Sequence, residues 1–308
     1  MPPLHPTPPP IPASPPPRPD TAAATGLRRV PLGIRYMMGA ALLFSLMTLF
    51  VKLAGQRLPP MQIVLARYVV MLAATHAMVR RAGVSVRGTD RKALVGRALT
   101  GFAALSLFYT ATTRLSLGDV TTIHYTSPVF TALFAWAALR ERTGGRVWAS
   151  TALSLLGVAL VARPSFLFGA SPVDQAAALL ALGGAVGSAM AYTFVRKLKD
   201  TDGPLVVIYW FSAIGLALTL PFALPVWLWP TPLEWAFLAA VGASTQAAQV
   251  CLTKGLHLEP AGRATAVGYL QIVFAFGWGL LVFDTAPDAL SLLGAAVIAV
   301  GVLLAARR

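Results

Sequence analysis

The sequence predicts an all-α integral membrane protein with ten transmembrane helices, arranged as two inverted five-helix repeats. Three observations support this: the composition, a series of apolar segments of membrane length, and an internal duplication. Of the 308 residues, 56% are hydrophobic and 12% are charged, whereas about 25% of the residues of a soluble domain are charged. We therefore expect the chain to lie in a lipid bilayer.

Ten apolar segments have the length of about 20 residues that an α-helix needs to cross the hydrocarbon core. Loops rich in proline, glycine and charged residues separate them. In chain order, the predicted spans cover residues 34–54, 60–79, 93–113, 118–139, 146–163, 174–195, 203–224, 232–252, 260–283 and 287–306. The loops are too short for a folded soluble domain, so we expect no extramembrane enzyme.

The apolar part of the chain is written twice, with an offset of about 144 residues. Gly118–Phe130 matches Gly262–Phe274 at five of thirteen positions, and Gly157–Arg163 matches Gly301–Arg307 at five of seven. Each copy holds an odd number of spans, so the two copies must cross the membrane in opposite directions. We expect repeats at residues 33–165 and 174–308, and inverted repeats are typical of secondary transporters.

The net charge of +14 is explained by membrane orientation. With the N-terminus in the cytoplasm, twenty of the 25 Lys and Arg residues fall in cytoplasmic tails and loops, and Arg97 is counted among them. This is the positive-inside pattern, so we expect no nucleic-acid partner. The prediction is a multi-pass protein of the bacterial inner membrane with both termini in the cytoplasm.

Residues 1–32 form a predicted disordered, proline-rich cytoplasmic tail. Eleven of the first nineteen residues are proline, a composition that favours an extended, solvated chain. The PxxP formed by Pro9 and Pro12 leaves a docking motif as a less favoured alternative. The segment lacks the apolar core of a signal peptide.

Polar residues form one face of the eighth predicted span. Gly242, Thr245, Gln246, Gln249 and Thr253 follow helical spacing. Polar groups are costly in hydrocarbon and tend to face a cavity or another helix. We favour substrate-cavity lining for Thr245, Gln246 and Gln249, with interhelical hydrogen bonding as the alternative.

A second group of polar candidates comes from the fourth and ninth spans. His124, Tyr125 and Ser127 lie in the first copy, and the duplication places Tyr269 opposite Tyr125 and Gln271 opposite Ser127. They are predicted cavity walls at the repeat interface. Hydrogen bonding inside the protein is the alternative for each tyrosine, and proton relay or core packing are the alternatives for His124. The coupling ion, if there is one, stays open.

Arg67 is a cation inside the second predicted span, about 10 Å of helix from its outer end. Every acidic residue lies at or beyond a predicted span end. Arg67 could therefore bind an anionic substrate group or hold backbone carbonyls, and both interpretations stay open.

Aromatic residues within the spans complete the predicted substrate site. Tyr192, Tyr209 and Trp210 could stack on a planar ligand, and packing is the favoured alternative for them. We expect no metal site, no cofactor and no catalytic residues, because motifs of membrane-embedded or hydrolytic enzymes are missing.

The stretch from Gly118 to Glu141 contains a tyrosine, then Pro128 and an apolar run that ends at Arg140 and Glu141. With two five-span copies, it resembles the EamA-type members of the drug/metabolite transporter superfamily. The resemblance implies a central cavity built from spans one to four and six to nine, with the fifth and tenth spans peripheral. Ile272 occupies the proline position in the second copy, so we expect the proline-shaped bend to be lost there.

The predicted function is secondary transport of a small metabolite by alternating access, with export favoured. Amino acids, nucleobases and drug-like compounds are the substrates that the resemblance implies. Import or facilitated diffusion of a vitamin, nucleobase or nucleoside-like compound is the first alternative. A membrane-embedded enzyme or a receptor subunit is disfavoured. The expected partners are the substrate and the lipid bilayer, and both a monomer and a homodimer remain compatible with the sequence.

Overall fold

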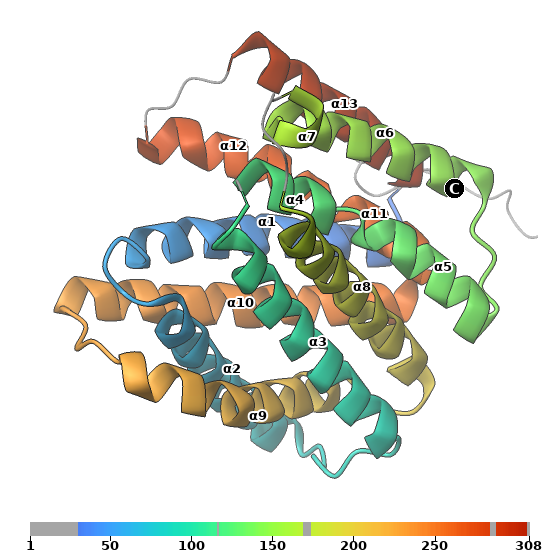
Figure 1. Ribbon diagram of the computed structural model, residues 1–308. Helices are drawn as coiled ribbons and strands as arrows, with labels where there is room; N and C mark the ends of the chain where they lie inside the picture. The colour runs from blue at the N-terminus through green and yellow to red at the C-terminus, as the bar shows by residue number, and fades with distance from the viewer. Residues whose placement is uncertain (1–29, 116, 169–173, 284–287, 307–308) are drawn as a thin grey trace, which may run out of the picture.

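The computed structural model describes residues 30–115, 117–168, 174–283 and 288–306, and the regular elements in this part of the chain are helices joined by short loops (Figure 1). Most of the proline-rich tail, residues 1–29, lies outside the described residues. The helices are α1 (Leu32–Ala54), α2 (Pro60–Ala82), α3 (Arg91–Thr112), α4 (Leu117–His124), α5 (Ser127–Leu139), α6 (Gly145–Ala162), α7 (Ser165–Phe168), α8 (Gln175–Lys197), α9 (Pro204–Ala223), α10 (Pro232–Leu258), α11 (Ala261–Val267), α12 (Leu270–Phe283) and α13 (Ala289–Ala306).

Within the described residues, nine helical segments are long and apolar enough to cross a membrane, with Ala261–Val282 counted as one of them. They agree with nine of the ten predicted spans. The remaining prediction, at residues 118–139, is occupied by α4 and α5, two helices that are each too short to cross alone. The protein is therefore a multi-pass, all-α membrane protein.

Two of the predicted continuous spans are broken near their middle. The first break is at Tyr125 and Thr126, where the next helix begins with Pro128 in its first turn. The second is at Gly268 and Tyr269, between α11 and α12. The expectation that the bend is lost in the second copy is therefore wrong.

The second break persists because tight turns can replace a proline. The Gly268 amide donates to the Thr265 carbonyl, and the Gln271 amide donates to the Gly268 carbonyl. These i→i+3 bonds tighten the chain and interrupt the α-helical ladder. The break therefore does not depend on a proline at position 272.

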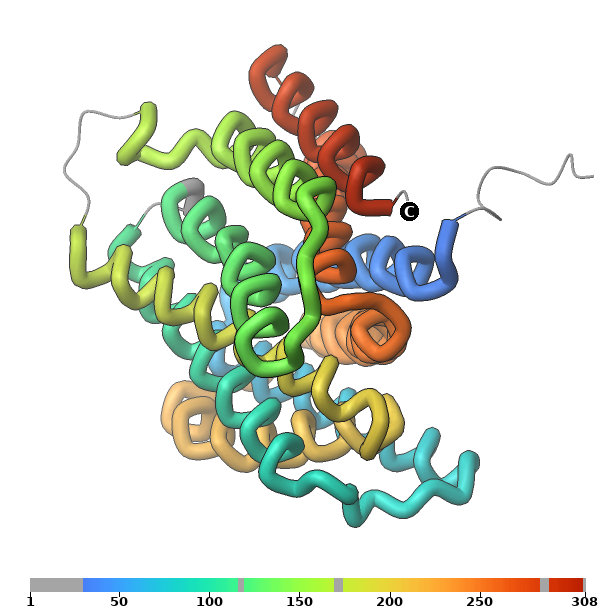
Figure 2. Tube along the Cα trace, turned by 90° about the vertical axis from the view of Figure 1, so that its right-hand side faces the viewer, coloured from blue at the N-terminus to red at the C-terminus, as the bar shows by residue number. Residues whose placement is uncertain are grey.

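The two repeats interlock through helix pairs that each join one copy to the other. Helix α1 packs against α10, α3 against α8, α2 against α9 and α6 against α13. Under the duplication α8 corresponds to α1 and α10 to α3, so the α1–α10 and α3–α8 pairs are images of each other. Figures 1 and 2 show the resulting bundle, with α6 and α13 on the side away from α2 and α9. That position agrees with the peripheral fifth and tenth spans that the resemblance implies.

Small residues allow α6 and α13 to approach closely. A Cβ atom at Gly157 would lie 2.7 Å from the carbonyl oxygen of Gly294, and one at Gly294 would lie 2.8 Å from the carbonyl oxygen of Gly157. Ser150 Oγ also donates a 2.6 Å hydrogen bond to the carbonyl of Gly301. Close backbone contact of this kind holds membrane helices together where lipid gives no hydrophobic drive.

Candidate functional site

The polar stripe of α10 faces α2, and its side chains differ in their hydrogen bonds. Gln246 Nε2 donates a 2.8 Å hydrogen bond to Thr75 Oγ1 on α2. Thr245 Oγ1 bonds within its own helix, to the carbonyl of Val241 at 2.6 Å. Gln249 is 6% exposed, and its Oε1 is buried without a hydrogen-bond partner in the described structure. Interhelical bonding therefore accounts for the amide nitrogen of Gln246, while the amide oxygens of both Gln246 and Gln249 are buried without a partner in the described structure.

Tyr125 and Tyr269 meet where the two broken helices cross. Their rings stack with centroids 5.6 Å apart and planes 27° apart. The Tyr269 hydroxyl donates a 2.8 Å hydrogen bond to the backbone carbonyl of Tyr125. Ser127 is buried in the first turn of α5, and Gln271 is partly buried in the first turn of α12. The breaks thus place pseudo-equivalent residues together, and the tyrosine hydroxyl completes the turn of the other repeat.

The other predicted aromatic candidates pack against different neighbours, and Tyr192 and Trp210 share the core cluster of Tyr125 and Tyr269. His124 packs edge-on against Phe108, with ring centroids 4.8 Å apart, and its buried Nδ1 has no partner in the described structure. Tyr209 lies beside His76 at 6.3 Å. Tyr192 and Trp210 pack against the main core. Trp210 Nε1 also donates to the Val86 carbonyl at 2.8 Å, so its polar atom ties α9 to the loop after α2.

Arg67 has a cationic neighbour that the predicted orientation had assigned to a cytoplasmic loop. Arg97 is only 3% exposed and lies within α3, its guanidinium carbon 4.0 Å from the Phe211 ring centroid. The Arg67 guanidinium carbon lies 5.2 Å from the Tyr68 ring centroid, and the Tyr68 and Phe211 rings meet edge-on at 5.5 Å. Counting Arg97 as a solvated loop residue was therefore wrong, and it belongs with Arg67 inside the bundle.

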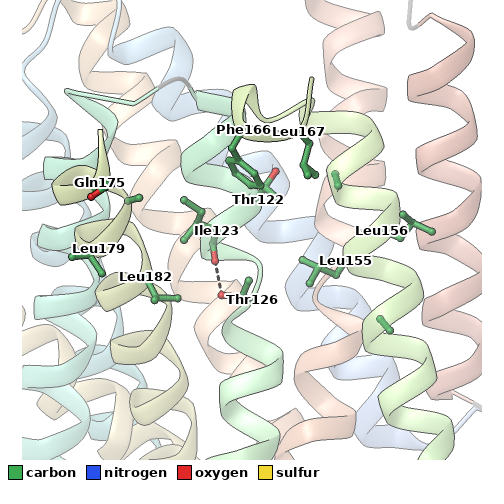
Figure 3. Close-up of a pocket in the computed structure, with 13 residues that line it drawn as sticks. Thr122, Ile123, Thr126, Leu155, Leu156, Phe166, Leu167, Gln175, Leu179 and Leu182 are labelled. Carbon is green, nitrogen blue, oxygen red and sulfur yellow. Dashed lines mark hydrogen bonds between the residues drawn. The ribbon is translucent and has the colours of Figure 1, made fainter. Parts of the chain in front are cut away.

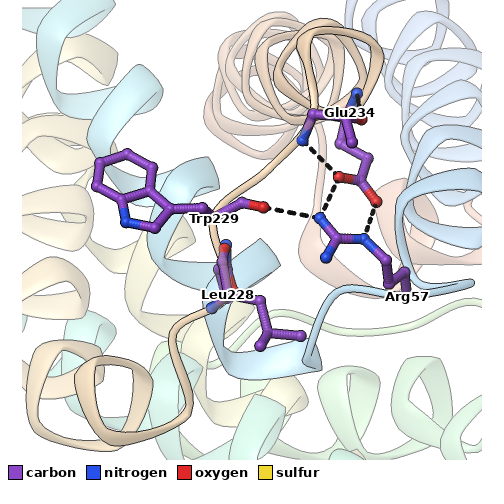
Figure 4. Close-up of polar contacts among 6 residues, drawn as sticks. Arg57, Leu228, Trp229 and Glu234 are labelled. Carbon is purple, nitrogen blue, oxygen red and sulfur yellow. Dashed lines mark hydrogen bonds and ion pairs between the residues drawn. The ribbon is translucent and has the colours of Figure 1, made fainter.

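At one end of the molecule, an exposed ion pair joins the repeats (Figure 4). Arg57 Nε donates to Glu234 Oε1 at 2.7 Å, and Arg57 Nη2 donates to the Trp229 carbonyl at 2.7 Å. The side-chain hydrogen bond to Glu234 raises the pKa of Arg57 above its ordinary value. Nearby, Gln62 bonds to both the carbonyl and the amide of Leu228. The loop after α1 is thereby tied to the start of α10.

At the opposite end, Glu141 joins the repeats through a more buried network. Its Oε1 accepts from Arg196 Nε at 2.6 Å and its Oε2 accepts from the Ala261 amide at 2.9 Å. Arg196 also donates to the carbonyls of Leu256 and His257. The end of α5 is therefore held against α8, α10 and α11, all of the second repeat.

Comparison with known proteins identifies the family. The model of the EamA-like transporter family matches residues 31–163 and again residues 175–307. The chain belongs to the EamA-like transporter family. It falls within the drug/metabolite transporter superfamily, as the motif resemblance implies. A membrane transporter of a small molecule, rather than an enzyme, is the class that this membership and the relatives support.

Relatives of this EamA-like transporter come from bacteria and animals. The chain is 31% identical over 269 residues to solute carrier family 35 member G1 of Homo sapiens, covering 83% of this chain and 73% of that protein. It is 28% identical over 276 residues to the pseudopaline exporter CntI of Pseudomonas aeruginosa, covering 89% and 96%. A solved structure, titled only as the crystal structure of a protein, aligns with a TM-score of 0.80 at 20% identity, over 89% of this chain and 96% of that one. That likeness supports the fold.

A groove of about 860 Å³ lies between α4, α6, α7 and α8 of this EamA-like transporter (Figure 3). Leucines of α6 and α8 form its sides, α7 covers one end, and α4 forms its floor with Thr122, Ile123 and Thr126. The Thr126 hydroxyl bonds to the Ile123 carbonyl at 2.6 Å, so its polar group is already satisfied. The predicted site residues are outside the lining of this apolar groove.

Arg97 is a buried cation that the sequence analysis placed in a loop, and one local signal could have identified its burial. Gly101 lies one helical turn further along α3, and a Cβ atom there would collide with the Arg97 guanidinium. A glycine four residues after an arginine lies on the same face of the helix and leaves room there for the long side chain. The glycine provides the space that the guanidinium occupies.

Proposed function

We propose that this EamA-like transporter is a secondary carrier that exports a small metabolite across the bacterial inner membrane by alternating access. The observation that carries the proposal is the pair of broken helices. Breaks at equivalent positions of the two repeats, joined by Tyr125 and Tyr269, are the arrangement by which repeat transporters build a site near the bilayer midplane.

Contacts between repeats at both ends support alternating access. Arg57 and Glu234 tie one end, and Glu141 and Arg196 tie the other. Motion of one repeat against the other must break one set while the other holds, so the two sets are suited to act as alternate closures. The exposed pair is inexpensive to break, because water and salt screen surface ion pairs.

The charge distribution supports the proposed orientation, with both termini in the cytoplasm. One relative, named as a pseudopaline exporter, aligns with this chain over nearly the whole length of both proteins. This relative favours export over uptake. The chemical class of the substrate must be inferred from the polar residues inside the bundle.

Flux in reconstituted vesicles tests the proposal. We would measure counterflow of labelled amino acids, nucleobases and vitamins in proteoliposomes whose protein orientation is determined with a protease-sensitive N-terminal tag. Protein-dependent, saturable flux is expected, and vesicles without protein are the control. A uniformly folded protein that moves none of these classes would contradict the carrier proposal, and net flux only toward the tag side would contradict export.

A further inference from the structure

We propose that Arg67 and Arg97 form a binding site for an oxyanion group, carboxylate or phosphate, of the transported substrate. This inference rests on the proposed transport function and names the substrate class. It would make the transported compound an organic anion. The site lies between α2, α3 and α9, with Tyr192 of α8 beside it.

The two guanidinium groups belong to one continuous cluster. Arg67 lies against Tyr68, Tyr68 against Phe211, and Phe211 against Arg97. The two arginines also interact electrostatically with each other. Arg67 lies about 10 Å along α2 from the start of that helix, and Arg97 lies about 10 Å along α3 from its start. Those starts are at opposite ends of the bundle, so the two arginines enter the cluster from opposite ends.

Within the part of the chain that the structure describes, neither arginine has a counter-ion. The ion pairs of the described carboxylates are all made with other cations: Arg57, Arg163, Arg196, Lys197, Lys199 and Arg263. The Nε atoms of both Arg67 and Arg97 are buried with no hydrogen-bond partner. Two guanidinium groups of like charge therefore belong to one cluster, and neither is paired with a carboxylate of the described residues.

The surrounding aromatic rings do not balance this arrangement. A cation–π contact is weak compared with the cost of removing a guanidinium from water. The cost is larger when a second cation is close. The energetic deficit is what a bound anion would remove, because it supplies both the counter-charge and the missing hydrogen-bond acceptors.

The polar groups of the cluster are mainly donors. A guanidinium only donates hydrogen bonds, while an ionised carboxylate or phosphate only accepts them. The Tyr68 hydroxyl is fully buried and interacts with the Arg67 guanidinium, and the phenols of Tyr109 and Tyr192 interact electrostatically with Arg67. Two guanidiniums surrounded by three phenol groups fit an acceptor-rich ligand better than a neutral or cationic one.

Matched acids and neutral compounds test the site in the full-length protein. We would measure the shift in the thermal unfolding midpoint with succinate against succinamide, glutamate against glutamine, and glycerol 3-phosphate against glycerol, at constant ionic strength. At least one acid is expected to stabilise the protein more than its neutral counterpart. The dicarboxylate and phosphate pairs distinguish the two kinds of oxyanion, and equal shifts within every pair would overturn the inference.

Four variants assign the effect to the cluster. Arg67→Gln and Arg97→Gln should each weaken anion binding about 10- to 100-fold, as expected for a lost charge-assisted hydrogen bond. Gly101→Ala keeps both charges but displaces the Arg97 guanidinium, so it should also weaken binding. Arg81→Gln removes an exposed arginine from the end of α2 and should leave binding unchanged.

A ligand-free measurement separates binding from a purely structural role. Without ligand, Arg67→Gln and Arg97→Gln should unfold at the same temperature as the unmodified protein or higher, because each removes an uncompensated charge. A fall of several degrees in both would assign the arginines to structure and overturn the site. Flux of neutral solutes without any preference for anions would refute this inference and leave the carrier proposal intact. Anion binding without flux of any solute would refute the carrier proposal and leave the anion-binding site intact.

Discussion

At the scale of single residues, Tyr269 shows how one repeat completes the other. Its hydroxyl bonds to the backbone of Tyr125 at the point where the first repeat leaves its helical ladder. An interrupted helix leaves backbone groups unpaired, and these are expensive to expose to hydrocarbon. A side chain from the opposite repeat satisfies one of them, so the two breaks stabilise each other.

Replacing Tyr269 by phenylalanine should lower the free energy of unfolding by ~1 kcal/mol, the usual size of such a hydrogen bond in a membrane protein. Thermal unfolding in detergent measures the effect. Tyr125→Phe is the matched control, because the bond uses the backbone carbonyl of Tyr125 and not its hydroxyl. No loss of stability in Tyr269→Phe would mean that ring packing, which both variants keep, and not this bond, joins the breaks.

At the scale of the helices, the α6–α13 pair depends on glycines whose hydrogen atoms face backbone. A Cβ atom at Gly157 would lie 2.7 Å from both the Gly294 carbonyl oxygen and Ile298 Cγ1. A backbone atom in a packed helix cannot move aside as a flexible side chain can. The close approach of these helices therefore requires glycine, the smallest residue, at position 157.

Gly157→Ala should destabilise the protein by ~1–3 kcal/mol, the usual cost of overpacking. Gly277→Ala is the comparison, since Gly277 lies within α12 with no atom within 4 Å of a Cβ position, and there alanine should stabilise the helix by ~0.5–1 kcal/mol. Chemical denaturation of the two variants should shift in opposite directions. A Gly157→Ala protein as stable as the unmodified one would show that α6 and α13 can separate without cost.

The helices follow from the sequence more readily than the breaks do. Hydropathy measures transfer into lipid, so it located the apolar segments, but it does not register an interrupted helix. Pro128 marked the first break, whereas the turn at Gly268 depends on local backbone hydrogen bonds. Arg97 was missed because a charge near a span end resembles a loop residue, and only the tertiary contact with Phe211 shows otherwise. Tyr125 and Tyr269 were recognised as equivalent positions because the duplication aligns them, but their stacking depends on tertiary packing.

For the whole molecule, alternating access requires the two ends to separate in turn. The end held by Arg57 and Glu234 is solvent-exposed, with 48% of the Arg57 side chain accessible, while the Arg196 side chain at the other end is 9% accessible. An exposed pair costs less to break than a buried one. We therefore expect the Arg57 end to open first from the conformation described here.

A covalent tie across that end should stop transport. Arg57→Cys with Glu234→Cys, in a Cys251→Ala background, places two thiols where the side chains now form an ion pair. A short bis-maleimide should reduce flux in vesicles at least tenfold in the double variant, while each single-cysteine variant keeps its activity after the same treatment. Unchanged flux in the linked protein would show that substrate passes without separation of this end.

The interlocked packing also constrains how the protein is made. Helix α1 rests on α10, and the Ser45 hydroxyl accepts its hydrogen bond from Trp278, 233 residues later in the chain. At about 5–20 residues per second of synthesis, that partner arrives roughly 10–50 s after Ser45. Until then the first half resides in the bilayer with its packing faces against lipid or the insertion machinery. Assembly of the bundle is therefore a late, almost post-translational event, and the timing of translation becomes part of the folding pathway.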